Sequence, residues 1–146
     1  MTKPALLNSA RSALAACALL AGTGPVPAQD SSLRVELNRL EPQGENCRTY
    51  LLIENAKGGA LRSLKLDLFA LDTDGVAAKR LAVEVGPVPE KKTLIKLFDF
   101  TGLACPRLGS LLLNDVITCE GADGPRDSCL SAIETGSKAG AVAFVK

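Results

Sequence analysis

Cysteine is the residue type with the greatest capacity for chemistry in this sequence, and its spacing favours disulfide bonds over metal binding. Five cysteines occur in 146 residues, and one of them lies within the first 28. The others form no short C-x-x-C pair of the kind found in zinc sites, and the chain has no histidine. We therefore expect two structural disulfides within residues 29–146, formed by Cys47, Cys105, Cys119 and Cys129.

An acidic segment is the second candidate site. Asp72 and Asp74, followed by Gly75, supply two of the carboxylates that a calcium-binding loop needs. An EF-hand loop also needs a third acidic position and a final bidentate glutamate. If Asp72 and Asp74 were the third and fifth ligand positions, Leu81 would stand where that glutamate falls. The same residues are preferred in hairpin turns, which is the interpretation we favour.

The sequence lacks the residues on which most catalysis at neutral pH depends. Histidine, the usual general base, is absent. A serine and lysine pair or two carboxylates would have to substitute, but the candidate serines lie in loop-like sequence without a nucleophile motif: Ser110, Ser128, Ser131 and Ser137. Asn114 and Asp115 interrupt an apolar run, either at a binding groove or, as we expect, as an outward-facing pair at a sheet edge. We predict no enzyme activity and no catalytic, cofactor-binding or metal-binding residue.

The charge of the chain argues against polyanionic partners. The sequence has 17 Lys and Arg against 16 Asp and Glu, and loss of Lys3 and Arg11 with a signal peptide would leave a formal charge of −1. Tryptophan is absent and few aromatic residues are available for stacking on bases. Six basic residues would form either a basic face or, as we favour, a solvated outer face that discourages edge-to-edge aggregation: Lys65, Lys79, Arg80, Lys91, Lys92 and Lys96. We expect no nucleic-acid partner.

The first 28 residues have the order of a secretion signal. Lys3 and Arg11 precede an uncharged run at 12–21, helix breakers follow at 22–25, and the small residue Ala28 offers a cleavage site. The apolar run is shorter than the roughly 20 residues of a membrane-spanning helix. A lipidation box ending at Cys17 is the alternative, which the short apolar segment before that cysteine disfavours. We expect cleavage of residues 1–28, a single mature domain at 29–146, a periplasmic or secreted location and no transmembrane span.

The rest of the chain has the pattern of an all-β domain. Apolar residues alternate with polar ones or form short runs, and Gly, Pro, Asn and Asp separate the runs. We predict strands at 33–40, 47–55, 63–70, 76–85, 93–98, 111–119 and 141–145. About seven short strands at this spacing predict an immunoglobulin-like two-sheet sandwich.

Strand direction then predicts the disulfide pairing. If consecutive strands alternate in direction, the second and the sixth run the same way, so Cys47 at the start of one lies near Cys105 just before the other. Cys119 closes the sixth strand, about 25 Å from that end, which is too far for a bond to Cys47. We therefore expect Cys47 to pair with Cys105, and Cys119 to pair with Cys129 across a polar loop at 120–128.

Parts of the chain also resemble known bacterial proteins. The region from Arg34 to Phe98 resembles small immunoglobulin-like modules of the FxLYD type, on the basis of Leu51, Ile53, Glu54, Asn55, Leu64, Leu66, Leu68, Phe69, Asp74, Gly75, Gly86 and Pro87. The whole domain is similar to small exported proteobacterial proteins of unknown function, through Phe98, Asp99, Phe100, Cys105, Leu112, Asn114, Asp115 and Cys119. These resemblances imply a fold and a compartment, and they imply no site residues.

Two functions remain open at this point. We favour a non-enzymatic binding or structural accessory module of the bacterial envelope, which contacts another envelope protein through loops or a sheet edge. The alternative is an exported domain that binds a small ligand or has weak enzymatic activity at a carboxylate-based site. A deep cavity with convergent carboxylates would favour the second function, and a flat sandwich surface would favour the first.

Overall fold

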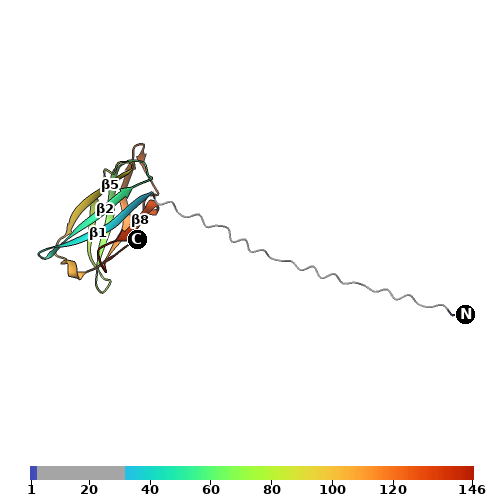
Figure 1. Cartoon of the computed structure of the whole chain (residues 1–146), viewed down its shortest axis with the longest axis horizontal. Helices are drawn as coiled ribbons and strands as arrows, with labels where there is room; N and C mark the ends of the chain where they lie inside the picture. The colour runs from blue at the N-terminus through green and yellow to red at the C-terminus, as the bar shows by residue number, and fades with distance from the viewer. Residues whose placement is uncertain (3–31) are drawn as a thin grey trace.

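The computed structural model describes residues 1–2 and 32–146, and residues 32–146 form an all-β sandwich of two sheets (Figure 1). The first sheet has the order β5-β2-β1-β8, with β1 at Leu33–Gln43, β2 at Asn46–Asn55, β5 at Lys92–Phe100 and β8 at Ile133–Ser137. The predicted signal peptide and the lipidation box at Cys17 lie outside the described residues, apart from the first two positions.

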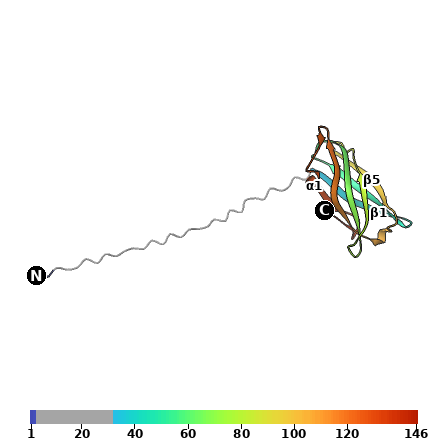
Figure 2. The same cartoon turned by 180° about the vertical axis from the view of Figure 1, so that it is seen from behind.

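The second sheet lies behind the first and is seen from its own side in Figure 2. Its order is β4-β3-β6-β7, and β9 also pairs with β6. The strands are β3 at Leu61–Asp72, β4 at Ala77–Glu84, β6 at Leu108–Gly121, β7 at Gly124–Pro125 and β9 at Ala143–Val145. A 3-10 helix, η1 at Cys105–Arg107, precedes β6, and the one-turn helix α1 at Cys129–Ala132 precedes β8.

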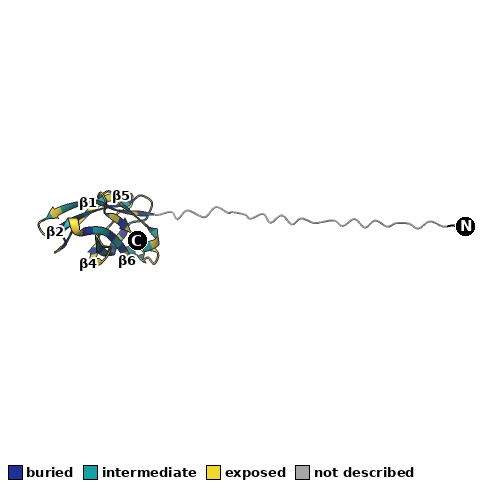
Figure 3. Ribbon diagram, turned by 90° about the horizontal axis from the view of Figure 1, so that it is seen from below, coloured by how far each residue is buried: buried dark blue, intermediate teal, exposed yellow. Residues whose placement is uncertain are grey.

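Alternation along the strands builds the core between the two sheets. Every second residue of β2 is buried, from Cys47 to Asn55, and the intervening residues face outward. Figure 3 shows the buried residues gathered between the layers. The largest fully buried apolar side chains come from both sheets and from the segment before η1: Leu37, Leu51, Ile53, Leu64, Leu66, Leu68, Leu103, Leu111, Leu113 and Ile133.

One polar group in this core has no partner. The Thr49 side chain is fully buried, and its Oγ1 makes no hydrogen bond in the described part of the chain. A buried hydroxyl without a partner loses its hydration and gains nothing in return. We expect Thr49→Val to raise the free energy of unfolding by about 1 kcal/mol in urea titrations, because it keeps the shape and removes the unpaired group.

The matched control is Thr49→Ser, which keeps the hydroxyl and removes the methyl group. We expect it to lower the free energy of unfolding by about 1 kcal/mol. A loss of stability in the valine variant would mean that the hydroxyl is hydrogen-bonded in solution.

The predicted sandwich and its two disulfides are confirmed, and the seven predicted strands correspond to β1, β2, β3, β4, β5, β6 and β9. The end of the chain differs from the prediction. After β7 the chain forms α1, adds β8 to the first sheet parallel to β1, and then turns so that β9 pairs with β6 in the second sheet. The prediction missed β8 because its sequence, IETGS, has no apolar alternation, and its pairing with β1 depends on tertiary contacts.

The helices of the described residues are short, three residues in η1 and four in α1. None of them combines the length and the apolar character that crossing a bilayer would require.

Candidate functional site

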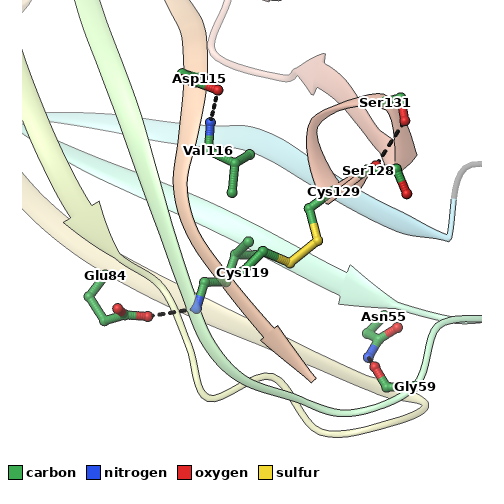
Figure 4. Close-up of a disulfide and its surroundings, with 10 residues drawn as sticks. Asn55, Gly59, Glu84, Asp115, Val116, Cys119, Ser128, Cys129 and Ser131 are labelled. Carbon is green, nitrogen blue, oxygen red and sulfur yellow. Dashed lines mark hydrogen bonds between the residues drawn. A yellow bond between two sulfur atoms is a disulfide. The ribbon is translucent and has the colours of Figure 1, made fainter. Parts of the chain in front are cut away.

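The four predicted cysteines form the two predicted disulfides. Cys47 at the start of β2 is bonded to Cys105 at the start of η1, with 4.7 Å between the Cα atoms. Cys119 near the end of β6 is bonded to Cys129 in α1, with 6.4 Å between the Cα atoms (Figure 4). Each bond therefore lies where strand direction placed it. Two disulfides in a chain of this size are typical of an oxidising compartment outside the cytoplasm.

The acidic segment at Asp72 is a turn in which the Asp72 carboxylate accepts hydrogen bonds from backbone N–H groups. Oδ1 of Asp72 accepts hydrogen bonds from the N–H groups of Asp74 and Val76, both at 2.9 Å. Gly75 adopts a φ of 79°, which glycine tolerates without strain. Within the described residues no three Cys, Asp or Glu side chains gather in a way that would hold a metal ion. The hairpin interpretation fits this geometry.

The structure separates the six basic residues that the sequence placed together. β3 and β4 belong to the second sheet, whereas β5 belongs to the first, so these residues do not all lie on one sheet. Arg80 of β4 lies over the outer side of the second sheet, where its guanidinium stacks on Phe69 at 5.4 Å from the ring centroid. Lys96 of β5 lies opposite the buried Leu51, on the inward side of the first sheet. A charge that points inward on an edge strand discourages pairing with another sheet.

Asn114 and Asp115 lie in a bulged part of β6. The register with β3 passes from Asp115 opposite Asp67 to Leu113 opposite Leu68, so Asn114 is the extra residue of a bulge. The bulge lets Nδ2 of Asn114 donate to Oδ2 of Asp67 at 2.8 Å. Arg80 donates to both oxygens of the same carboxylate, at 2.7 and 3.1 Å. The Asp67 side chain is only 3% exposed, although it stands on the outer side of its sheet.

Three carboxylates in the described residues have pKa values below their usual range. Hydrogen bonds from Arg80 are the main cause at Asp67, and hydrogen bonds from Arg48 are the main cause at Asp99. Burial raises the pKa of Glu84, but hydrogen bonds from the N–H groups of Leu64 and Gly86 and from the Ser63 hydroxyl together lower it by more. All three groups are therefore held as carboxylates by their neighbours.

This arrangement predicts how stability depends on pH. Because the pKa of each group is lower in the folded than in the unfolded state, its contribution is complete above the unfolded pKa and is lost as the pH falls through the folded value. The usual values are 3.8 for Asp and 4.5 for Glu, and no histidine titrates near neutrality. We expect the free energy of unfolding to stay nearly constant from about pH 5.5 to 8 and to fall below about pH 4.

Denaturant titrations at several pH values measure this profile. The variant Asp67→Asn should be less stable at neutral pH and should lose less stability on acidification than the natural chain, because its amide does not titrate. An unchanged acid slope in this variant would contradict the role assigned to Asp67.

The outer face of the first sheet carries an exposed apolar cluster. Tyr50 and Leu52 of β2 lie opposite Leu97 and Ile95 of β5, and these four residues define what we call the outer-face patch. Ile95 is 44% exposed and Leu97 is 52% exposed, whereas Tyr50 and Leu52 are half-buried. Sequence alternation did not identify the patch, since both faces of β5 are rich in apolar residues.

Charged residues form a rim around the outer-face patch, and they are paired. Arg48 donates to both oxygens of Asp99, at 2.9 and 3.1 Å. Glu41 accepts a hydrogen bond from the Tyr50 hydroxyl at 2.9 Å and lies 3.0 Å from the Arg39 guanidinium. The bond to Glu41 is also the main reason that the pKa of Tyr50 is raised.

A buried carboxylate lies further along the same face. Glu36 of β1 is 2% exposed, and Arg34 lies 2.7 Å from it. Asn38 donates to its other oxygen at 3.1 Å, and Lys138 lies 3.5 Å away. The i, i+2 spacing of Arg34, Glu36 and Asn38 places all three on one side of the strand, which is the sequence signal for this network. The Glu36 carboxylate therefore holds Arg34, Asn38 and Lys138 in place on this face of the sheet.

The second candidate surface is a groove along β6, which we call the β6 groove. It has a volume of about 330 Å³ and lies between β6 and the segment that carries α1. The Cys119–Cys129 bond joins its two walls, as Figure 4 shows. Asp115, Glu120 and Asp127 contribute carboxylates to its lining, and Arg126 is the basic residue of the lining.

Comparison with protein-family models and with curated protein sequences gives no match. Among solved structures, the chain is similar to IrmA from Escherichia coli, with a TM-score of 0.54 and 14% sequence identity. The similarity covers 70% of this chain and 89% of that chain. At 14% identity the comparison supports only a shared two-sheet β fold, which IrmA, a bacterial protein, also has.

Proposed function

We propose that this protein is a non-enzymatic binding module of the bacterial cell envelope, exported to the periplasm or beyond and acting by contact with another protein. The outer-face patch is the observation that carries the proposal. It has an apolar centre with a tyrosine and a rim of arginine–carboxylate pairs, the composition typical of protein interfaces. An immunoglobulin-like relationship of the FxLYD type fits the same role, because such modules are common in envelope proteins.

The carboxylates favour this proposal over a carboxylate-based enzyme. A general acid needs a raised pKa, whereas Asp67, Glu84 and Asp99 have lowered values and are held by arginine or backbone N–H groups. Each of these groups serves to hold strands or loops together. For the same reason none of these three carboxylates is free to bind a small ligand.

Substitution of Leu97 tests the proposal. We expect Leu97→Glu to reduce capture of partner proteins from envelope extracts by about tenfold or more, because a charge at the centre of an apolar contact is left without hydration or a partner. Quantitative mass spectrometry of the captured proteins, with the natural chain as reference, is the measurement.

The matched control is Val76→Glu. Val76 is 61% exposed in the turn between β3 and β4, away from the outer-face patch. Both variants should unfold at the same denaturant concentration as the natural chain. Equal loss of capture in the two variants, or no loss in either, would refute the outer-face patch as the contact surface.

A further inference from the structure

One stretch of β6 has a strand on one side only. β9 pairs with Ser110, Leu111 and Leu112, and β7 pairs with Glu120 and Gly121, both on the side of β6 away from β3. Residues 113–119 lie between these two pairings. In the described part of the chain, no strand pairs with them on that side. Residues 115–119 of this interval line the β6 groove, and Leu113 and Asn114 line a neighbouring hollow beside Lys146.

The hydrogen bonds of β3 show which backbone groups of β6 face this gap. The N–H of Leu64 donates to Oε1 of Glu84, and its C=O accepts from the N–H of Val85, so Leu64 directs both groups away from β6. By alternation Leu66 and Leu68 do the same. Their partners in β6 are Val116 and Leu113, whose N–H and C=O groups therefore point to the side of β6 away from β3.

The bulges of β6 give these groups the spacing of a regular strand. Leu113, Val116 and Cys119 are three residues apart in sequence, but they lie opposite Leu68, Leu66 and Leu64, which are two apart. The gap therefore matches five residues of an unbulged strand, roughly 16 Å at about 3.3 Å per residue. The N–H of Arg126 already donates to the C=O of Cys119 at 2.9 Å, and β9 pairs up to Leu112. An extended peptide of five residues can therefore place its alternate residues opposite the C=O of Leu113, both backbone groups of Val116 and the N–H of Cys119.

The Asp115 side chain forms a hydrogen bond with one of these backbone groups. Its Oδ1 accepts the N–H of Val116 at 2.8 Å, as Figure 4 shows. The carboxylate is exposed, so this bond can be exchanged for one to another strand without opening the core. Asp115 thus acts as a replaceable cap on the exposed edge.

The surroundings of the gap select a thin, positively charged occupant. β7 and β9 flank the gap at its two ends, and α1 lies across the groove. The edge of a second folded sheet would therefore collide with these elements before it reached the backbone of β6. Three carboxylates against one arginine give the lining a net charge of −2. Val116 packs against the core and Asp115 lies on the outer side, which favours alternation of apolar and basic residues in the occupant.

We propose that the β6 groove binds an extended peptide segment of a partner protein, with apolar and basic residues in alternation, as an added strand between β7 and β9. The proposal rests on the general role as a binding module, but it uses a surface other than the outer-face patch. On binding, a backbone C=O of the peptide accepts the hydrogen bond from the N–H of Val116 in place of Asp115. The freed Asp115 carboxylate then pairs with a basic side chain of the peptide.

The test uses the oxidised protein and two capped synthetic peptides, Val-Lys-Val-Lys-Val and Val-Glu-Val-Glu-Val. We expect the lysine peptide to bind roughly tenfold or more tightly than the glutamate peptide at low salt, and the difference to shrink as salt is added. Amide resonances in NMR should shift most at 113–119, and hydrogen exchange of the Val116 amide should slow on binding. Equal affinity for the two peptides, or shifts centred on β4 or β5, would overturn the proposal.

Three variants separate the possible causes. Asp115→Asn keeps an acceptor for Val116 but removes the charge, and we expect it to weaken the lysine peptide about threefold. Asp123→Asn, in the turn after β6 and outside the groove lining, should leave the affinity unchanged. Leu97→Glu should also leave it unchanged. If the Leu97→Glu variant lost affinity for the lysine peptide, the peptide would bind at the outer-face patch and the groove proposal would be refuted. If that variant lost only the capture of partner proteins, the result would concern the proposed function and leave the groove proposal intact.

Discussion

Replacement of both Cys47 and Cys105 by alanine is expected to lower the free energy of unfolding by about 4 kcal/mol. The bond closes a loop with a sequence separation of 58 residues, and its loss restores the conformational freedom of that loop to the unfolded chain. The half-cystine at Cys47 is also fully buried, so the substitution leaves unfilled space beneath β2. Equilibrium unfolding in urea, with the oxidised natural chain as reference, measures the loss.

The second disulfide provides the matched control. Cys119 and Cys129 are separated by 10 residues, for which the same chain-entropy estimate gives about 2.7 kcal/mol. We therefore expect the Cys119→Ala, Cys129→Ala variant to be the more stable of the two double variants. The reverse order would show that contacts across the β6 groove outweigh the entropy of loop closure.

Replacement of Asn55 by alanine is expected to lower the free energy of unfolding by about 3 kcal/mol. This side chain is 1% exposed at the end of β2. Nδ2 donates to the carbonyl oxygens of Gly59 and Pro89, at 3.2 and 3.0 Å, and Oδ1 accepts the N–H of Gly58 at 3.0 Å. Alanine would leave three partly buried backbone groups without their partner. Equilibrium unfolding again gives the measurement.

Two further substitutions test the explanation. Asn55→Asp keeps the acceptor for Gly58 but cannot donate to Gly59 and Pro89, so we expect it to be at least as destabilising as alanine. Asn46→Ala removes one exposed hydrogen bond, from Gly102 N–H to Oδ1 at 2.8 Å, and should cost about 1 kcal/mol or less. Similar losses at Asn46 and Asn55 would show that the buried network has no special role.

The two candidate surfaces make different demands on a partner. The outer-face patch presents side chains to a folded surface, whereas the β6 groove presents backbone groups to an extended segment. A partner with both a folded domain and a flexible basic tail would satisfy both. The variants Leu97→Glu and Asp115→Asn address the two surfaces separately.

The sequence by itself determined the elements that depend on local pattern. Period-two alternation in 63–70 predicted the core of β3, and the Asp and Gly preferences of turns predicted the hairpin at Asp72 to Gly75. Strand direction together with the length of the predicted strand at 111–119 determined the pairing of Cys47 with Cys105, because that strand separates Cys119 from the end of the sandwich at which Cys47 lies. These features follow from the geometry of an extended chain.

Only the tertiary structure decided which face of β5 is buried and how β6 meets its neighbours. Leu94 and Phe98 alternate with Ile95 and Leu97, so both faces of β5 are apolar, and packing against the second sheet selects the inward one. The return of the chain through β8 and β9 leaves the gap beside residues 113–119. Both decisions depend on contacts between residues far apart in sequence, and local pattern carries no information about such contacts.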